Sequence, residues 1–163
     1  MVQDTSAQGK DDNVDKALDK SSLVSDIARP PTVLQVLPEL VTGGVERGTV
    51  EIAGAIVEGG GRAVVASAGG PMIRELSRLG AEHIELPVKS KNPFVMQKNV
   101  GRLADLAKAE NVDIIHARSR ASAWSAMYAA RRSEKHFITT FHGTYGHRNA
   151  LKWVYNSIMT KGE

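Results

Sequence analysis

The sequence contains no cysteine among its 163 residues, and this absence narrows the chemistry that the chain can carry. Disulfide bonds and thiolate metal sites are excluded, and the composition fits a reducing compartment. No apolar run approaches the roughly 20 residues that a membrane-spanning helix needs. Residues 1–30 also lack the apolar core of a secretory signal peptide. These absences predict a cytoplasmic protein.

Several motifs of nucleotide-binding and metal-binding enzymes are missing as well. The dinucleotide pattern G-x-G-x-x-G fails at Gly43, Gly44 and Val45, and Ser67 occupies the place of its acidic residue. The sequence has no P-loop, its five histidines lack zinc-ligand spacing, and no serine stands in a nucleophile elbow. The sequence therefore disfavours nicotinamide, flavin, P-loop and zinc enzymes and serine hydrolases.

The charge of the chain is unevenly distributed. The net charge is +3, but residues 1–30 carry six Asp against four Lys or Arg and thus −2, which leaves the remainder at +5. A mildly basic body suits a phosphorylated ligand or an anionic membrane surface. The basic residues are scattered and form no nucleic-acid-binding motif, so we expect no nucleic-acid partner.

The first thirty residues are rich in Asp, Lys, Ser and Gln and hold few large apolar side chains. Such a segment buries too little apolar surface to offset the entropy of ordering it, so residues 1–30 are predicted to be a disordered tail. Pro30 and Pro31 mark the boundary. Residues 31–163 are predicted to form one domain.

From Thr32 onward, short apolar segments alternate with segments of helical periodicity. The predicted strands are residues 32–37, 62–67, 83–88, 113–116 and 136–141, and the predicted helices are residues 45–58, 72–79, 94–110, 120–132 and 148–159. This alternation predicts a parallel sheet covered by helices on both faces. Right-handed crossovers make it a doubly wound, Rossmann-like α/β domain.

Helical spacing also predicts how several side chains are used. Those sharing one face of the first helix are Thr49, Ile52, Ala53 and Ile56. Those expected to pack rather than to form a ligand platform are Trp124, Met127, Tyr128 and Trp153. Glu46, in the first turn of the first helix, is interpreted as structural, because acidic residues are favoured at helix starts.

Ligands of doubly wound sheets bind beyond the carboxyl ends of the strands. This rule selects five loops, which are residues 38–44, 68–71, 89–93, 117–119 and 142–147. The chemically interesting residues of the chain fall in or beside these loops. We therefore expect the site at this edge of the sheet.

Gly43 and Gly44 lie between the first strand and the first helix. Exposed amides at a helix N-terminus, together with the positive end of the helix dipole, attract phosphate. The alternative interpretation is a tight turn that needs glycine for its geometry alone. The pair by itself leaves both interpretations open.

Three further groups stand at the same edge. His142 follows the fifth strand in "TTFHGTYG", either as a packing residue or with its ring over the sheet's edge. His116, Arg118 and Ser119, in "IIHARSR", form either a solvated strand end or a set of donors for a polar substrate. The basic loop "KSKNPF", residues 89–94, is either solvated or binds an anionic acceptor.

Taken together, these pieces resemble the amino-terminal domain of GT-B glycosyltransferases of family 4, the retaining type that uses nucleotide sugars. The resemblance rests on "LVTGGVERGTVEIA", "SKNPF", "DIIHARSRASAWSAMYAARR" and "FITTFHGTY", which follow one another in order. It covers residues 31–159. It implies one half of a GT-B architecture, and its close form is similar to bacterial enzymes of lipopolysaccharide core or other surface glycans.

The resemblance implies roles for individual residues. Gly43 and Gly44 match a glycine turn whose amides approach the donor diphosphate, and His142 matches a histidine at the transferred sugar and the reaction centre. The residues implied on the substrate or acceptor side are His116, Arg118, Ser119, Lys89, Ser90, Lys91 and Asn92.

The implied chemistry is hexosyl transfer from a nucleoside diphosphate sugar to a hydroxyl, with retention at the anomeric carbon. Helix-end amides and cations stabilise the charge of the departing diphosphate. Family enzymes of this type generally need no bound divalent metal, so the resemblance implies no cofactor beyond the donor substrate. A lipid-linked acceptor would bring the protein to the inner face of the plasma membrane.

The resemblance stops before the second Rossmann-like domain that a GT-B enzyme needs, so the chain is expected to be a truncated half. Three interpretations follow: a glycosyltransferase seen as its acceptor-side domain, a non-catalytic orphan domain that binds a partner, or a phosphate-binding domain unrelated to sugars. Without the second domain, an exposed apolar patch near the carboxyl terminus and a tendency to associate are expected.

Overall fold

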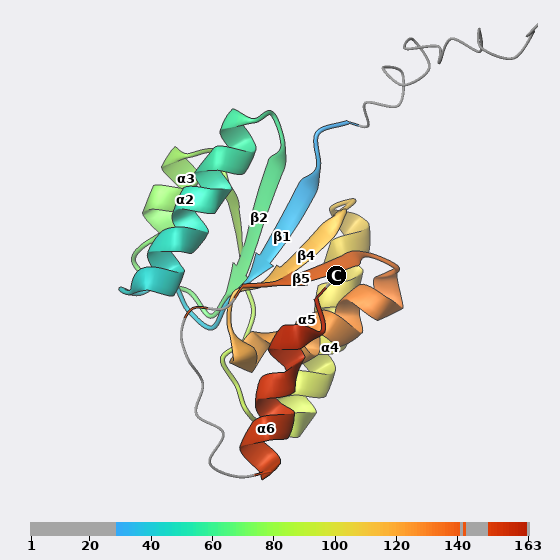
Figure 1. Cartoon of the computed structure of the whole chain (residues 1–163). Coiled ribbons are helices and arrows are strands. Elements are labelled where there is room, and N and C mark those ends of the chain that lie inside the picture. The colour runs from blue at the N-terminus through green and yellow to red at the C-terminus, as the bar shows by residue number, and fades with distance from the viewer. Residues whose placement is uncertain (1–28, 141, 143–149, 163) are drawn as a thin grey trace, which may run out of the picture.

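The computed structural model describes residues 29–140, 142 and 150–162, and only the backbone of residues 150 and 151. Within these residues, five parallel strands form one sheet in the order β3-β2-β1-β4-β5 (Figure 1). The strands are β1 (Thr32–Val36), β2 (Arg62–Ser67), β3 (Glu82–Glu85), β4 (Ile114–Ala117) and β5 (His136–Thr139). The Rossmann-like sheet predicted from the sequence is confirmed.

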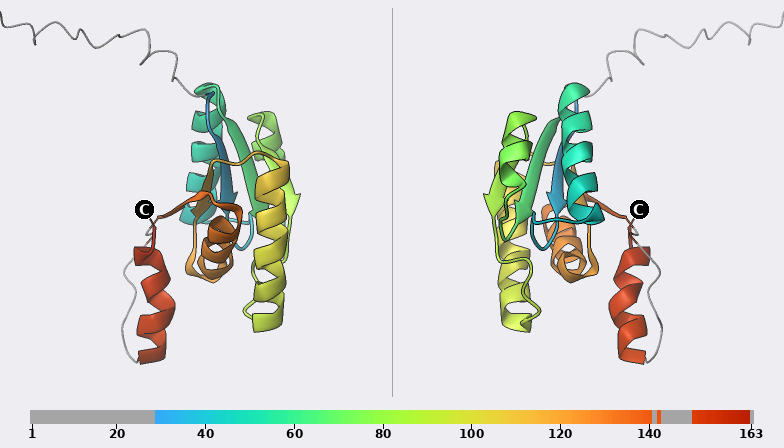
Figure 2. Two further views of the ribbon diagram at one scale, coloured as in Figure 1. Left: turned by 90° about the vertical axis from the view of Figure 1, so that its right-hand side faces the viewer. Right: turned by 90° about the vertical axis from the view of Figure 1, so that its left-hand side faces the viewer.

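Helices cover both faces of the sheet, as the edge-on views of Figure 2 show. They are α2 (Gly44–Glu58), α3 (Ile73–Arg78), α4 (Pro93–Ala109), α5 (Arg120–Ser133) and α6 (Ala150–Ser157), with the short 3-10 helix η1 (Ile158–Thr160) after α6. Most of the predicted tail (1–28), the predicted strand end at 141, the start of the last predicted helix (148–149) and most of its preceding loop (143–147) lie outside the described residues.

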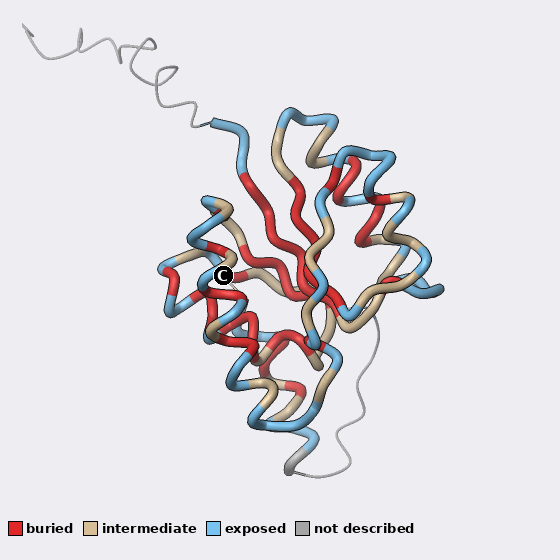
Figure 3. The backbone as a smooth tube through the Cα atoms, turned by 180° about the vertical axis from the view of Figure 1, so that it is seen from behind, coloured by how far each residue is buried: buried red, intermediate tan, exposed pale blue. Residues whose placement is uncertain are grey.

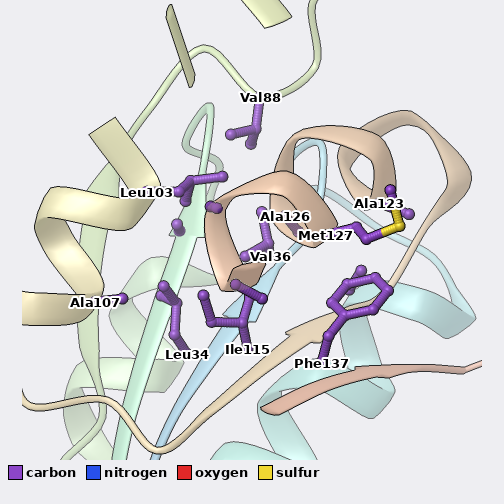
Figure 4. Close-up of a cluster of buried hydrophobic side chains, with 14 of the residues drawn as sticks. Leu34, Val36, Val88, Leu103, Ala107, Ile115, Ala123, Ala126, Met127 and Phe137 are labelled. Atoms are coloured by element: carbon purple, nitrogen blue, oxygen red, sulfur yellow. The ribbon is translucent and has the colours of Figure 1, made fainter. Parts of the chain in front are cut away.

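Two apolar cores lie on opposite faces of the sheet, because successive strand residues point to opposite sides. Val64 packs in the cluster formed with α4 and α5, whereas its neighbour Val65 packs in the cluster formed with α2 and α3. In the larger core, Leu34 and Ile115 of the central strands meet Leu103 of α4 (Figure 4). The strands β1, β2 and β4 are the most continuously buried segments of the fold (Figure 3). Burial on both faces explains their near-continuous apolar sequence.

Two element boundaries have local causes. The Asn92 side chain accepts a hydrogen bond from the Phe94 N–H at 2.9 Å, and Pro93 stands at the first helical position, so α4 begins there. β3 ends at Glu85, before the predicted end at residue 88. The N–H of Leu86 still bonds the Ser67 carbonyl at 2.8 Å, but Pro87 has no N–H with which to continue the ladder.

Some predicted side-chain positions are wrong. In α2 the buried face holds Val50 and Gly54 beside the expected Thr49 and Ala53, while Ile52 is 42% exposed. Gly54 faces Leu79 at the end of α3, so packing against α3 turns the helix in a way that its own sequence does not reveal. Trp153 is 61% exposed and does not pack in the core as expected.

Candidate functional site

The loops after β1 and β4 diverge at the carboxyl edge of the sheet. β1 pairs with β2 on one side and with β4 on the other, and the helices that follow β1 and β4 lie on opposite faces. Doubly wound domains bind their ligands at such a reversal of strand order, and we call this part of the edge the crevice. The site is built from the start of α2, the end of β4 and the segment after β5.

The glycine turn begins α2. Gly43 is the N-cap residue, and no side chain caps the helix there. A Cβ atom on Gly43 would collide with the Glu46 carboxylate, whereas a Cβ on Gly44 would meet nothing within 4 Å. Space for a ligand therefore adjoins Gly44, and the carboxylate of Glu46 stands beside the turn.

His116 is the second-last residue of β4 and pairs in register with Gln35 of β1. The residue is buried, and its Nε2 atom shares a hydrogen bond of 2.6 Å with the Thr140 hydroxyl. Burial lowers the pKa of His116 to about 4, with smaller contributions from the charges of Arg118 and His142. The interpretation of a solvated strand end is wrong for this residue, which is a neutral imidazole at physiological pH.

Arg118 is also buried, directly after β4. Its Nε donates to the Thr49 hydroxyl at 3.3 Å, and that hydroxyl donates to the Val45 carbonyl at 2.7 Å. One guanidinium nitrogen occupies the space where a side chain at Gly48 would begin, 2.8 Å from an ideal Cβ. The first turns of α2 thus make room for Arg118.

No carboxylate in the described part of the chain forms an ion pair with Arg118. Burial lowers the pKa of the guanidinium, which shows that removal from water disfavours its charge. A buried cation is costly unless an anion compensates it. The position of Arg118 against the first turns of α2 therefore favours a negatively charged ligand.

His142 belongs to the same electrostatic group. Burial and the charge of Arg118 lower the pKa of His142, and the carboxylate of Glu46 opposes that shift. Glu46, interpreted from the sequence as structural, is a site residue that the sequence analysis missed. The sequence feature that could have indicated this role is the place of Glu46 in the first turn of α2, three residues after Gly43.

The other predicted residues are spread over neighbouring positions. Ser119 caps the start of α5 by position, and its hydroxyl lies 3.2 Å from that of Ser122. Lys89 forms an ion pair of 2.6 Å with Glu39, which ties the loop after β3 to the loop after β1. Asn92 caps α4, as described above, and its N–H donates to the Ser90 hydroxyl at 3.2 Å.

Lys91, between Ser90 and Asn92 in the same loop, lies at an apolar surface. It lines a shallow pocket with Met96, Trp124 and Val154, formed by α4, α5 and α6. A second pocket along α4 and α5 shares Met96 and Trp124 and extends to Tyr128. The predicted acceptor residues therefore lie in two places: His116 is at the carboxyl edge of the sheet, whereas Lys91 is at this apolar surface.

Among the residues that the structure describes, no three His, Asp or Glu side chains lie close enough together to hold a metal ion. None of the helices in the described ranges is both long and apolar enough to cross a bilayer.

Comparison with known proteins gives a consistent family assignment. The family model described as Glycosyltransferase Family 4 matches residues 42–162. A glycosyltransferase from Rickettsia africae has a solved structure with 47% sequence identity and a TM-score of 0.69, and the match covers 80% of this chain and 35% of that chain. No curated protein sequence matches the chain.

Two more distant structures share the fold. The Anabaena protein HepE, solved in complex with UDP and glucose, has 16% identity and a TM-score of 0.63, with 80% of this chain and 36% of that chain covered. MurG of Acinetobacter baumannii has 16% identity and a TM-score of 0.53, with 68% and 34% covered. The chain thus spans about a third of the length of each of these solved proteins.

Proposed function

Because this chain belongs to glycosyltransferase family 4, we propose that it forms one half of an enzyme that transfers a hexose from a nucleoside diphosphate sugar to a hydroxyl acceptor. Transfer with retention at the anomeric carbon is part of the proposal. The single observation that carries it is the buried, uncompensated guanidinium of Arg118, which lies against Gly48 and Thr49 of α2, the helix that begins at the uncapped glycine turn. A diphosphate supplies the missing negative charge.

The donor is placed at this turn. Gly44 leaves the backbone open to a phosphate, whose charge is stabilised by the helix amides and the dipole of α2. As the glycosidic bond breaks, negative charge grows on the departing diphosphate, and a preorganised cation such as Arg118 stabilises that charge more than it stabilises the bound donor. HepE was solved with UDP and glucose, and a donor of this class is what we propose here.

His142 is assigned to the reaction centre. Its lowered pKa keeps the imidazole neutral at physiological pH, so that it can exchange a hydrogen bond with a sugar hydroxyl without adding charge beside Arg118. His116 and Ser119, with Lys89, Lys91 and Asn92 in the loop after β3, are assigned to the substrate or acceptor side. We also propose that a second Rossmann-like domain completes the site.

The acceptor is proposed to belong to bacterial lipopolysaccharide or another surface glycan. A lipid-linked acceptor fits the exposed apolar surface of α4 to α6, where Phe94 is 78% and Val154 is 50% exposed. Lys91 stands on the same surface. We therefore propose peripheral contact with the cytoplasmic face of the membrane.

The test of the donor site is UDP binding by Arg118 variants. We expect Arg118→Gln to weaken UDP binding by roughly tenfold or more, because a charge-assisted hydrogen bond is lost. Arg118→Lys keeps the positive charge but lacks the paired N–H donors of the guanidinium, so its UDP affinity should lie between those of the parent chain and Arg118→Gln. Arg102→Gln, on the exposed side of α4, is the matched control. Equal UDP affinity for the parent chain and Arg118→Gln would show that the guanidinium serves packing alone.

A further inference from the structure

A separate pocket lies on the other side of the glycine turn, between α2 and α3. Its volume is about 580 Å³, and the loop after β1 contributes Thr42 and Gly43 to its wall. This size lies within the range of small-molecule sites. None of the residues assigned above to the substrate side lines it.

The pocket is strongly basic. Three arginines line it, Arg47 from α2 and Arg74 and Arg78 from α3, together with the single carboxylate of Glu75. Arg74 and Arg78 are four residues apart on the helix, so they project from the same side. Three positive charges and one negative charge give the lining a net charge of +2.

The four charges are not equivalent. Glu75 forms an ion pair with Arg47, which joins α3 to α2 across the pocket. Within the described residues, neither Arg74 nor Arg78 forms an ion pair with a carboxylate. Two guanidinium groups therefore face the pocket with their charges uncompensated by the protein.

We propose that this pocket binds the phosphate monoester of a phosphorylated sugar, which makes the acceptor a phosphosaccharide. A phosphate monoester carries close to two negative charges at pH 7, which matches the two unpaired arginines, whereas a carboxylate carries one. The planar guanidinium presents paired N–H donors that fit phosphate oxygens. Neutral sugars offer nothing for these charges to bind.

The pocket is placed to serve the reaction. Gly43 belongs both to its wall and to the turn that begins α2, so a sugar held by its phosphate here lies next to the proposed donor site. Naming the ligand an acceptor rests on the proposed function. The binding of a phosphosugar by Arg74 and Arg78 does not.

The experiment is a nuclear magnetic resonance titration of the chain with glucose 6-phosphate, glucose and glucuronate at low ionic strength. We expect glucose 6-phosphate to bind most tightly and glucose not to bind. The double variant Arg74→Gln and Arg78→Gln should weaken glucose 6-phosphate binding by about tenfold or more. The matched control is Arg131→Gln with Arg132→Gln, two exposed residues at the end of α5, which removes the same charge elsewhere.

A third variant reverses the sign of the effect. Glu75→Gln frees Arg47 and raises the net charge of the lining to +3, so it should tighten glucose 6-phosphate binding. The proposal is overturned if the Arg74 and Arg78 variant binds like its control, if Glu75→Gln weakens binding, or if glucose and glucose 6-phosphate bind equally.

UDP binding separates this proposal from the donor site. The Arg74 and Arg78 variant should bind UDP like the parent chain, since neither arginine is assigned to the donor. The chain could bind the phosphosugar through these arginines and yet fail to bind UDP. That result would support the phosphate-binding pocket and contradict only its description as an acceptor site.

Discussion

His116 and Arg118 stand two residues apart at the end of β4, and burial lowers the pKa of both. The consequences differ because their ordinary pKa values differ. His116 loses its proton and becomes a neutral partner of Thr140, whereas a guanidinium keeps its charge at any physiological pH. The site thus combines a neutral ring with a buried cation, an arrangement suited to an anionic ligand.

The first prediction concerns the pH dependence of stability. In the unfolded chain His116 binds a proton below pH 6.5, but in the fold it does so only below about 4. Between these values the unfolded state holds more protons, so the free energy of unfolding falls as pH falls from 6.5 to about 4, by at most about 3 kcal/mol from this residue. Above pH 6.5 His116 is neutral in both the folded and the unfolded chain, so the free energy of unfolding does not suffer this loss.

Urea unfolding at pH 7, 5 and 4 checks this prediction with His116→Gln, which keeps a polar partner for Thr140. The variant should lose less stability than the parent chain as pH falls, and the difference between the two isolates His116 from the other titrating groups. Parallel pH profiles for both proteins would contradict the assigned pKa.

At the scale of elements, α2 and β4 are joined through a contact that depends on a small residue. Gly48, one turn into α2, leaves the space that the Arg118 guanidinium fills. Gln35 reinforces the same junction, because its buried side chain donates from β1 to the Thr49 carbonyl at 3.0 Å. The helix therefore fixes the position of the cation as well as covering the sheet.

The second prediction follows from this junction. Gly48→Val should push the guanidinium out of place and weaken UDP binding by about tenfold, a loss comparable to that of one charged hydrogen bond. Gly101→Ala in α4 is the control, since a Cβ there meets only the tip of Arg132 at 4.0 Å. Calorimetric titration with UDP measures both variants. A Gly48→Val chain that stays folded and binds UDP unchanged would show that the guanidinium is not needed at that place.

The elements are also where sequence prediction worked best. The alternation of short strand-like segments with periodic helices located all five strands along the chain, and the central strands are apolar because they are buried on both faces. The carboxyl-edge rule likewise selected the loops that hold Gly43, Arg118 and His142. Prediction failed where tertiary packing decides: the burial of Arg118 depends on Gly48, and the turned face of α2 depends on Leu79.

At the scale of the whole molecule, the described part presents a broad apolar surface over α4, α5 and α6. Its two shallow pockets share Met96 and Trp124, and Trp153 and Val154 on α6 are largely exposed. The exposed apolar patch expected near the carboxyl terminus is thus present. A tendency of the chain to associate stays a prediction.

The third prediction concerns membrane contact. The chain should bind vesicles containing phosphatidylglycerol more tightly than vesicles of phosphatidylcholine alone. Phe94→Asp should weaken that binding by about tenfold or more, because it removes apolar area that the lipid would bury and adds a negative charge near the anionic lipid. Ile52→Asp makes the same change on α2, which covers the opposite face of the sheet, and should have little effect. Co-sedimentation measures vesicle binding by both variants. Equal losses of binding in the two would contradict membrane contact through the surface of α4 to α6.

The most direct test of the central claim is hexose transfer by the chain mixed with the part of the Rickettsia africae glycosyltransferase that it does not cover. We predict transfer from a nucleoside diphosphate sugar only on mixing, with His142→Ala slower by about 100-fold. Folded components that show no transfer together, or a His142→Ala variant as active as its parent, would contradict the assignment of this crevice as half of a glycosyltransferase site.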